Sequence, residues 1–349
     1  MGLFRRVARA RLAGRVVRRL RHSGIPGARY YSAAFEVRFT RPGDEQSTIL
    51  PLTPLLGRSR RELGAYLAGI VRTGNLPEDW ASAAPRLRPV LRGSAAGAPL
   101  CRPVLPFLSE FVVVDHPDTI TYVTPDQLAA WEVTEDQVFD AARANLSGAV
   151  LHGAPTTKPV VVRFVDDGNA YWTSHLLLPG WLDRLAEQVG GPPVAFAPER
   201  GTLLVAADDH DLLRALFAQV EEIYARSSRS LTPMAYVSGP DGCPVPYPAP
   251  PGHPLHPAVS RAERILAVEE YNRQAAELPD AAELRLTGSD TDGWRTRALW
   301  ERDAPILLPA ADEVQAGDRV LPWTGLELTP AEDLTPARWR ARKWPDPGT

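Results

Sequence analysis

The sequence predicts an α+β protein built from two small halves, each combining a short mixed sheet with helices, followed by a helix-plus-strand extension. A chain of 349 residues is too long for one ordinary hydrophobic core and suits two. Apolar runs that alternate like hairpin strands are followed by helix-type patterns, without a regular strand–helix repeat. The 35 prolines are about twice the average usage and predict short elements joined by long connections.

Composition narrows the class of protein. Hydrophobic residues make up 44% and charged residues 23% of the chain, which is typical of a globular protein. The two cysteines, Cys101 and Cys243, lack a C-x-x-C or a matching histidine spacing, so neither a disulfide framework nor a zinc site is predicted. No apolar run of about 18 residues and no apolar signal-peptide core are present. We therefore expect a cytoplasmic protein without a cofactor.

The first residues differ in charge from the rest of the chain. The net charge is −3, but residues 1–24 contain eight arginines and no acidic residue, which leaves −11 on the remainder. These arginines are Arg5, Arg6, Arg9, Arg11, Arg15, Arg18, Arg19 and Arg21. They predict a basic N-terminal arm over residues 1–30. A helical wheel gives the arm a narrow apolar stripe of Leu3, Val7, Ala10, Gly14 and Val17.

An arginine-rich arm of this kind suits an anionic partner. An anionic membrane surface, a phosphate backbone, and the acidic face of another protein or of this protein's own body all fit. A solvated helix or an unstructured start would explain the same residues without a function. Nucleic acid is the least favoured partner, because no glycine–aromatic motif and no second basic patch follow.

The first half is predicted over residues 31–105. The stretch "FEVRFTR" alternates like a half-buried strand, and "PGDEQSTILPL" returns as the second strand of a hairpin. Ser59 and Glu62 have the spacing of a capping box and begin a predicted helix in "SRRELGAYLAGIV". The stretch "PRLRPVLRG" is expected to form a strand that Pro89 interrupts.

The second half is predicted over residues 106–232. It begins with a hairpin, "EFVVVDHPDTITYVT", and continues with two helices that start at Thr124 and Thr134, each followed by glutamine at the third position. Further on, hairpin and helix patterns recur, and Asp208 and Asp209 precede a helix as caps. The acidic residues of this half are thus expected to begin helices.

The remaining chain is predicted as a linker and an extension. Residues 233–258 are expected to form a proline-rich linker, either a stiff, extended spacer or an irregular covering strap; a spacer is favoured over a site for a polyproline-reading domain. The C-terminal α+β extension over residues 259–349 opens with an amphipathic helix and continues with strand-like runs. Residues 294–344 contain five of the nine tryptophans, which we expect to fill a thin core.

Three sequence blocks in order resemble the YtpQ family of bacterial proteins. They are "RLRPVLRG", "ITYVTPDQLAAWEVTEDQVFDAARANL" and "DDGNAYWTSHLLLPGWLDRLAEQVGGPPVAFAPERGTLLVAA". The resemblance covers residues 35–224 and implies a soluble cytoplasmic α+β protein, without an established activity, cofactor or catalytic set. The arm and the chain beyond residue 232 have no counterpart in the short family members. The bias toward Ala, Arg and Pro also resembles actinobacterial proteins.

Two clusters of acids with histidine are the candidates for metal or acid–base chemistry. They are Asp115, His116 and Asp118 in "VDHPD", and Asp208, Asp209 and His210 in "ADDHD". If the fold joins them, a metal could bind Asp115, His116, Asp208 and His210, while His116, Asp118, Asp209 and His210 would be the catalytic groups. A turn and a helix cap explain the same residues without catalysis. No G-x-S-x-G, P-loop or G-x-G-x-x-G motif occurs.

These observations favour a non-catalytic binding or adaptor protein over an enzyme. Its expected partner is another protein, bound through the eight arginines, with peripheral membrane contact as an alternative and nucleic acid disfavoured. The other function hypotheses are a metal-dependent hydrolase that uses the two clusters and a chaperone-like peptide binder that uses a sheet edge. Deleting residues 1–24 is expected to weaken partner association in a salt-sensitive way.

Overall fold

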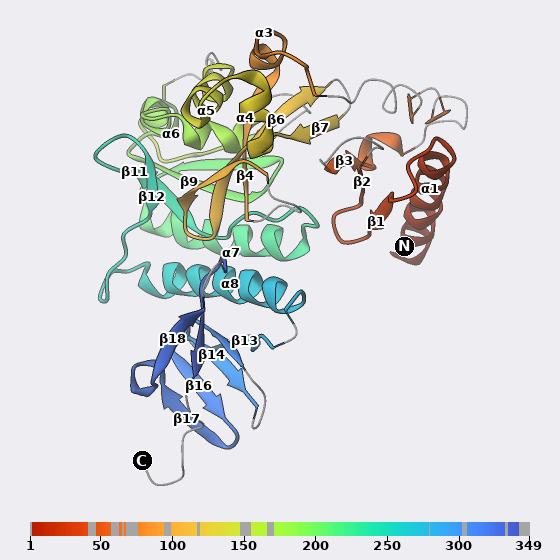
Figure 1. The fold of residues 1–349 in the computed structure, drawn as a ribbon. Helices are drawn as coiled ribbons and strands as arrows, with labels where there is room; N and C mark the ends of the chain where they lie inside the picture. Colours follow the sequence, from red (N-terminus) through yellow and green to blue (C-terminus); the bar gives the residue numbers. More distant parts are fainter. Residues whose placement is uncertain are drawn as a thin grey trace.

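The protein has an α+β fold in which helices cover four sheets (Figure 1). The structure is a computed structural model and describes residues 2–40, 47–56, 63–64, 66–67, 76–93, 99–116, 119–146, 155–165, 171–278, 280–301, 306–331 and 334–341. The α-helices named in Figure 1 are α1 (Gly2–His22), α3 (Trp80–Ala83), α4 (Pro125–Trp131), α5 (Glu135–Ala144), α6 (Ala186–Val189), α7 (His210–Arg226) and α8 (His256–Ala275). The predicted fold class is confirmed.

The first sheet is antiparallel and has the order β1-β2-β3-β7-β6-β4, with β5 also paired to β6. Its strands are β1 (Arg29–Tyr31), β2 (Glu36–Thr40), β3 (Ser47–Pro51), β4 (Leu87–Arg92), β5 (Cys101–Leu105), β6 (Leu108–His116) and β7 (Thr119–Tyr122). The predicted boundary between residues 105 and 106 falls inside this sheet. Because β6 pairs with strands on both sides, the sheet continues across that boundary.

The basic N-terminal segment is a helix whose inner face belongs to the core of the first sheet. Leu12, Ala13, Val16 and Leu20 of α1 are buried together with Val37 and other apolar residues of β2 and β3. The predicted apolar stripe is wrong at Ala10 and Gly14, which are exposed, whereas Val17 is partly buried against the core. Leucine and valine four residues apart bury more apolar surface than alanine and glycine, so they decide which face points inward.

The predicted helix starts next to the first sheet are found in the structure. Thr134 accepts a hydrogen bond from the backbone N–H of Gln137, and the Gln137 side chain accepts from the Thr134 N–H, which completes a capping box. Thr124 is the N-cap of α4, with proline in the first turn. Behind α5, the Asn145 amide donates to two backbone carbonyls near the start of β4, at 2.7 and 2.9 Å. The predicted helix at residues 59–71 lies mostly outside the described residues. Its described residues, 63–64 and 66–67, are helical.

The second sheet has the order β12-β11-β9-β10-β8 and is antiparallel. Its strands are β8 (Val161–Val165), β9 (Pro193–Glu199), β10 (Thr202–Ala207), β11 (Ala235–Ser238) and β12 (Pro244–Pro246). One face packs on α7 and α8, and the other packs on the 3-10 segments η3 (Trp172–Leu177) and η4 (Leu182–Leu185). The predicted hairpin of β9 and β10 and the Asp209 cap of α7 are confirmed.

The predicted proline-rich linker is part of the second sheet. Within residues 233–258, β11 pairs with β9 and β12 pairs with β11, while Tyr247 and Leu255 are buried in the core. Proline lacks a backbone N–H, which an outer strand can tolerate, and Pro244 and Pro246 lie on the outermost strand of the sheet. The segment is therefore structural and does not serve as a spacer.

The C-terminal part consists of α8 and two small sheets below it in Figure 1. Their strands are β13 (Leu284–Ser289), β14 (Gly293–Trp300), β15 (Leu307–Pro309), β16 (Glu313–Ala316), β17 (Arg319–Pro322), β18 (Leu328–Ala331) and β19 (Arg338–Ala341). Trp300 is buried as expected, whereas Trp294, Trp323 and Trp339 are only half-buried. Because α8 packs on α7 with one face and on these sheets with the other, it joins the C-terminal part to the second sheet.

The carboxylate of Glu270 on α8 makes stability depend on pH. The residue is 4% exposed, and its side chain packs so closely on Gly93 that a Cβ there would stand 2.7 Å from Oε1. Burial raises the pKa of Glu270 above its ordinary value of 4.5, although the ion pair with Arg273 opposes this shift. A pKa raised in the folded state contributes stability below the unfolded pKa, and this contribution is lost as pH rises through the folded pKa.

Glu270→Gln is therefore expected to be more stable than the native protein at about pH 7 and equally stable at about pH 4. Thermal unfolding at both pH values measures this difference. Glu277→Gln is the control, because Glu277 is exposed just after the same helix and does not contribute to the pKa shift of Glu270. Lower stability of Glu270→Gln at neutral pH would show that the ion pair with Arg273 outweighs the cost of burial.

Candidate functional site

The outer face of α1 carries a group of exposed arginines. Because Leu12, Val16 and Leu20 point into the core, the helix is fixed in rotation and its charged residues face solvent. Two arginines are engaged within the protein: Arg9 lies 4.7 Å from the centre of the Phe35 ring, and Arg21 donates to the Ala28 carbonyl at 3.0 Å. Arg5 and Arg6 lie in the helix, but their side chains fall outside the described part.

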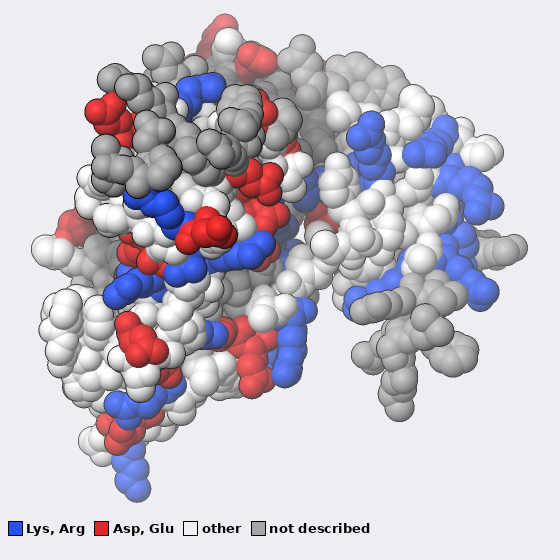
Figure 2. Space-filling view, turned by 90° about the horizontal axis from the view of Figure 1, so that it is seen from below, with Lys and Arg blue, Asp and Glu red and all other residues white. Residues whose placement is uncertain are grey.

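The remaining arginines of α1 form what we call the arginine face: Arg11, Arg15, Arg18 and Arg19. Among the described residues, none of these four forms an ion pair with an acidic side chain. Figure 2 shows basic side chains spread over uncharged surface on the side where α1 lies, whereas basic and acidic side chains alternate elsewhere in that view. The arginine face therefore has an excess of positive charge that the described part of the chain does not neutralise.

A hollow of about 580 Å³ lies beside the arginine face. It is lined by Arg15, Arg18, Arg19, His22, Ser23 and Leu63. The guanidinium of Arg19 lies against Gly64, where a Cβ would stand 2.8 Å from Nη2, so a glycine leaves room for it. His22 binds the Arg18 carbonyl through Nδ1 at 2.7 Å, which fixes its ring. The hollow can therefore receive an acidic side chain between several guanidinium groups.

The two acid–histidine clusters are not brought together as one site in the described residues. Asp115 and His116 end β6 in the first sheet, and Asp115 binds the hydroxyl of Tyr171. Asp118 lies outside the described residues. Where the chain is described, no group of three or more His, Cys, Asp or Glu side chains could hold a metal ion.

The second cluster lies between β10 and α7 in the second sheet, and its acids have structural roles. Asp208 accepts a hydrogen bond from the Tyr247 hydroxyl at 2.7 Å, and Asp209 caps α7 by accepting from the Leu212 N–H at 2.9 Å. The ring of His210 packs edge-on against His253. The two clusters thus have separate local partners. The second contains a helix cap as expected, whereas Asp115 and His116 end a strand and the remainder of the expected turn lies outside the described residues.

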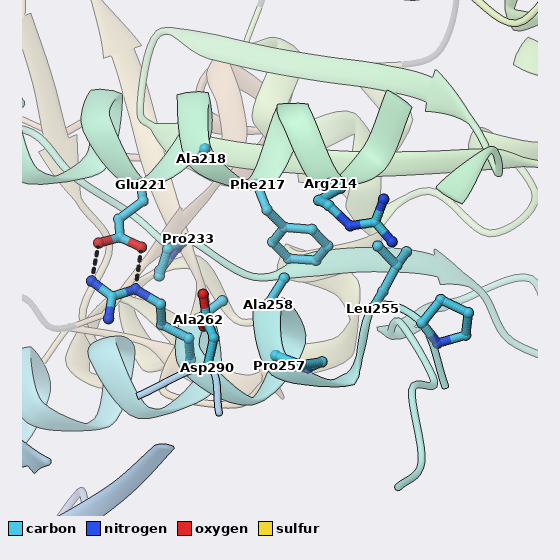
Figure 3. A pocket seen from close by; sticks show the side chains of 12 residues that line it. Arg214, Phe217, Ala218, Glu221, Pro233, Leu255, Pro257, Ala258, Ala262 and Asp290 are labelled. Atoms are coloured by element: carbon cyan, nitrogen blue, oxygen red, sulfur yellow. Dashed lines mark hydrogen bonds and ion pairs between the residues drawn. The ribbon is translucent and has the colours of Figure 1, made fainter. Parts of the chain in front are cut away.

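A pocket of about 390 Å³ lies between α7 and α8 (Figure 3). Phe217 and Leu255 line its apolar part, and Arg261 donates twice to Glu221 at its rim, at 2.6 and 2.7 Å. The other charged groups that line it are also engaged: Arg214 pairs with Asp211, and Asp290 accepts from the Trp294 ring N–H. Ligand pockets usually present polar groups that are ready to bind, so these internal pairs do not favour a ligand site here.

Sequence reasoning missed a second group of arginines, Arg92, Arg200 and Arg229, at the junction of the two sheets. The strand "RLRPVLRG" contains a signal for it, because Arg88, Val90 and Arg92 alternate and so share one face of β4. No sequence pattern links this strand to Arg200 or Arg229. We call Arg92, Arg200 and Arg229 the junction arginines.

The three blocks that resemble the YtpQ family lie on structural elements of the fold. They correspond to β4, to β7 with α4 and α5, and to the segment from η3 to β10. The resemblance therefore rests on residues that form caps, hairpins and core, and it stays a prediction. Comparison of this chain with protein-family models, curated proteins and solved structures gives no match.

Proposed function

We propose that this protein is a non-catalytic binding or adaptor protein that engages an acidic protein partner through the arginine face of α1. The observation that carries this proposal is the group of four exposed guanidinium groups without acidic partners in the described part, on a helix that the core holds in place. Complementary charge steers association and favours partners of opposite sign. A fixed helix also presents its arginines in one geometry, which favours recognition of a particular surface.

A protein partner fits better than a membrane or nucleic acid. Amphipathic helices bind membranes by inserting apolar side chains below the headgroups, but Leu12, Val16 and Leu20 of α1 are already buried in the protein core. None of the described helices has the length and apolar character needed to cross a bilayer. Sequence-tolerant nucleic-acid binding combines basic groups with exposed stacking aromatics, whereas Phe35 beside Arg9 is buried. The free thiols of Cys101 and Cys243 fit a reducing cytoplasm.

Charge reversal on the arginine face tests the proposal without removing the core of α1. The variant is Arg11→Glu, Arg15→Glu and Arg18→Glu together, and its matched control is Arg86→Glu, Arg184→Glu and Arg295→Glu, which changes three exposed arginines elsewhere. The full chain, the variant and the control are used as baits in extract from the host cells, followed by quantitative mass spectrometry. An acidic partner retained by the native chain should be reduced by about tenfold or more in the variant only.

The nature of the contact is then measured with the purified partner. Its association with the native chain should slow steeply as salt increases, because salt screens exposed charges. Phosphatidylserine vesicles and a DNA duplex are tested alongside, and binding that follows the arginine face to either of these would replace the proposed partner class. Equal recovery of all partners by the native chain, variant and control would refute the proposal.

A further inference from the structure

Three segments that are far apart in the sequence bring the junction arginines together. Arg92 ends β4 in the first sheet, Arg200 lies in the turn between β9 and β10 of the second sheet, and Arg229 follows α7. The backbone N–H of Arg200 donates to the Arg229 carbonyl at 3.0 Å, which fixes these two segments beside each other. The η3 segment lies against β4, and the Thr173 hydroxyl on it donates to the Arg200 carbonyl.

Among the described residues, Arg92 and Arg200 each have a buried hydrogen-bond donor without an acceptor. Arg92 is 6% exposed, and within the described part of the chain the one hydrogen bond of its side chain runs from Nη1 to the Leu91 carbonyl at 2.6 Å. The Nε atoms of Arg92 and Arg200 are shielded from solvent and have no hydrogen-bond partner in the described part of the chain. A buried donor without an acceptor is costly, and more so on a charged group.

The carboxylates around the junction arginines are committed elsewhere. Glu36 is buried and accepts from the Nε of Arg38 at 2.7 Å. Glu199, next to Arg200 in the chain, accepts from the hydroxyls of Thr202 and Ser227, both at 2.8 Å. Where residues are described, no ion pair joins a carboxylate to Arg92 or Arg200. The positive charges of Arg92 and Arg200 are therefore not neutralised by an ion pair within the described residues.

The positive charges also act on one another. Burial is the main cause that lowers the pKa of Arg200 to about 9, and the nearby charges of Arg92 and Arg229 act in the same direction. Tyr122 and Glu36 oppose this shift. The group still carries a proton at neutral pH. Guanidinium groups held together in a partly desolvated place lower the stability of the protein unless an anion compensates them.

We propose that the junction arginines form a binding site for a small, multiply charged oxyanion of the phosphate type, held between the two sheets. Guanidinium groups offer N–H donors in a planar fork that matches phosphate oxygens. Arg200 and Arg229 are only partly buried, so an anion can approach the group from their side, while Arg92 lies deeper. The anion would accept from the unused donors and join both sheets, which makes this site independent of the arginine face of α1.

Isothermal titration and thermal unfolding of the full chain test this site with defined anions. The probes are inorganic phosphate, pyrophosphate and glycerol 3-phosphate, each compared with sodium chloride at equal ionic strength and pH. We expect at least one phosphate probe to bind and to raise Tm relative to chloride. Preference for inorganic phosphate or pyrophosphate would identify a free ion, and preference for glycerol 3-phosphate would identify a phosphate ester.

Variants of the arginines separate a binding site from a structural cluster. Arg200→Gln should weaken binding by about tenfold to a hundredfold and should keep or raise Tm in chloride, because one of the repelling charges is removed. Arg92→Gln should weaken binding to a similar extent. If this variant does not fold, because Arg92 has lost its hydrogen bond to the Leu91 carbonyl, the result for Arg200→Gln decides. Arg226→Gln is the control, since its side chain is 79% exposed on nearby α7.

Two results would overturn the inference. One is a native chain whose Tm and titration show no difference between the phosphate probes and chloride. The other is native affinity in Arg200→Gln, or an equal loss in Arg226→Gln, which would assign the effect to general electrostatics. A lower Tm of Arg200→Gln in chloride would likewise show that the arginine serves the fold and not a ligand.

Discussion

Replacing Arg338 with methionine should destabilise the C-terminal part of the protein by about 3 to 5 kcal/mol. Arg338 on β19 is fully buried and stands in the middle of this part of the chain. Its guanidinium donates to the Gln274 side chain and to the carbonyls of Tyr271, Ala282 and Leu307, at 2.5 to 3.0 Å. These acceptors belong to α8 and to segments before β13 and in β15, so one side chain joins three parts of the chain.

The expected loss of stability is large because methionine would leave the hydrogen-bond acceptors of Arg338 without a donor. Methionine fills similar space but donates nothing, so buried carbonyls lose their partners, each at about 1 to 3 kcal/mol. Burial itself lowers the pKa of Arg338, which shows that the charge is not favoured there for its own sake. The donated hydrogen bonds are what make arginine necessary, and lysine cannot replace its fork of donors.

Denaturant unfolding followed by tryptophan fluorescence measures this prediction, because Trp300, Trp323 and Trp339 lie in the same part of the chain. Arg340→Met is the matched control, since Arg340 is exposed on the same strand. That variant should remain within about 0.5 kcal/mol of the native protein. Similar losses in both variants would mean that the charge on β19 matters and the buried hydrogen bonds do not.

The parts of the fold that the sequence predicted correctly are those determined by neighbouring residues. The capping box of Thr134 and Gln137 lies within one helical turn, and the hairpin of β9 and β10 is closed by its own turn. The strand around Pro89 was also predicted, but the interruption at Pro89 was wrong: β4 runs through this residue, because a proline is acceptable on an edge strand and β4 is the last strand in the order of the first sheet. In each case the physical cause is local.

The parts that the sequence did not predict depend on contacts between distant segments. The pairing of β3 with β7 carries the first sheet past the expected boundary, and the pairing of β11 with β9 turns the expected linker into a strand. Both pairings depend on burying a whole face of a sheet, and a short sequence pattern does not contain this information. The junction arginines are missed for the same reason, since Arg92 and Arg200 meet only when the two sheets do.

The residues of the candidate site on α1 were predicted from the sequence, but the packing of α1 against the first sheet was not. Arg11, Arg15 and Arg18 face solvent as the charge pattern indicates. The pattern placed them on a separate arm, whereas the structure places them on a helix of the first core. Deleting residues 1–24 would therefore remove buried leucines and a valine along with the arginines. A loss of binding after that deletion would report unfolding as readily as recognition, so charge reversal is the better test.

Leu20→Ala should lower the free energy of unfolding by about 3 kcal/mol, within the usual range for a buried leucine. Leu20 is fully buried beneath the first sheet, together with Val16 one turn earlier and with Ile25 after the helix. The substitution removes apolar contacts and leaves a cavity, because β2 and β3 hold the surrounding backbone in place. Denaturant unfolding of the full chain measures the loss.

Gly14→Ala on the opposite face of α1 is the matched variant, and it should have the opposite sign. Gly14 is exposed, and a Cβ there would meet nothing within 4 Å, so alanine should stabilise the helix by about 0.5 to 1 kcal/mol. The pair of variants decides which face of α1 is buried. If Gly14→Ala were destabilising and Leu20→Ala neutral, the apolar stripe read from the sequence would face the core, and the arginines assigned here to the outer face would be turned away from a partner.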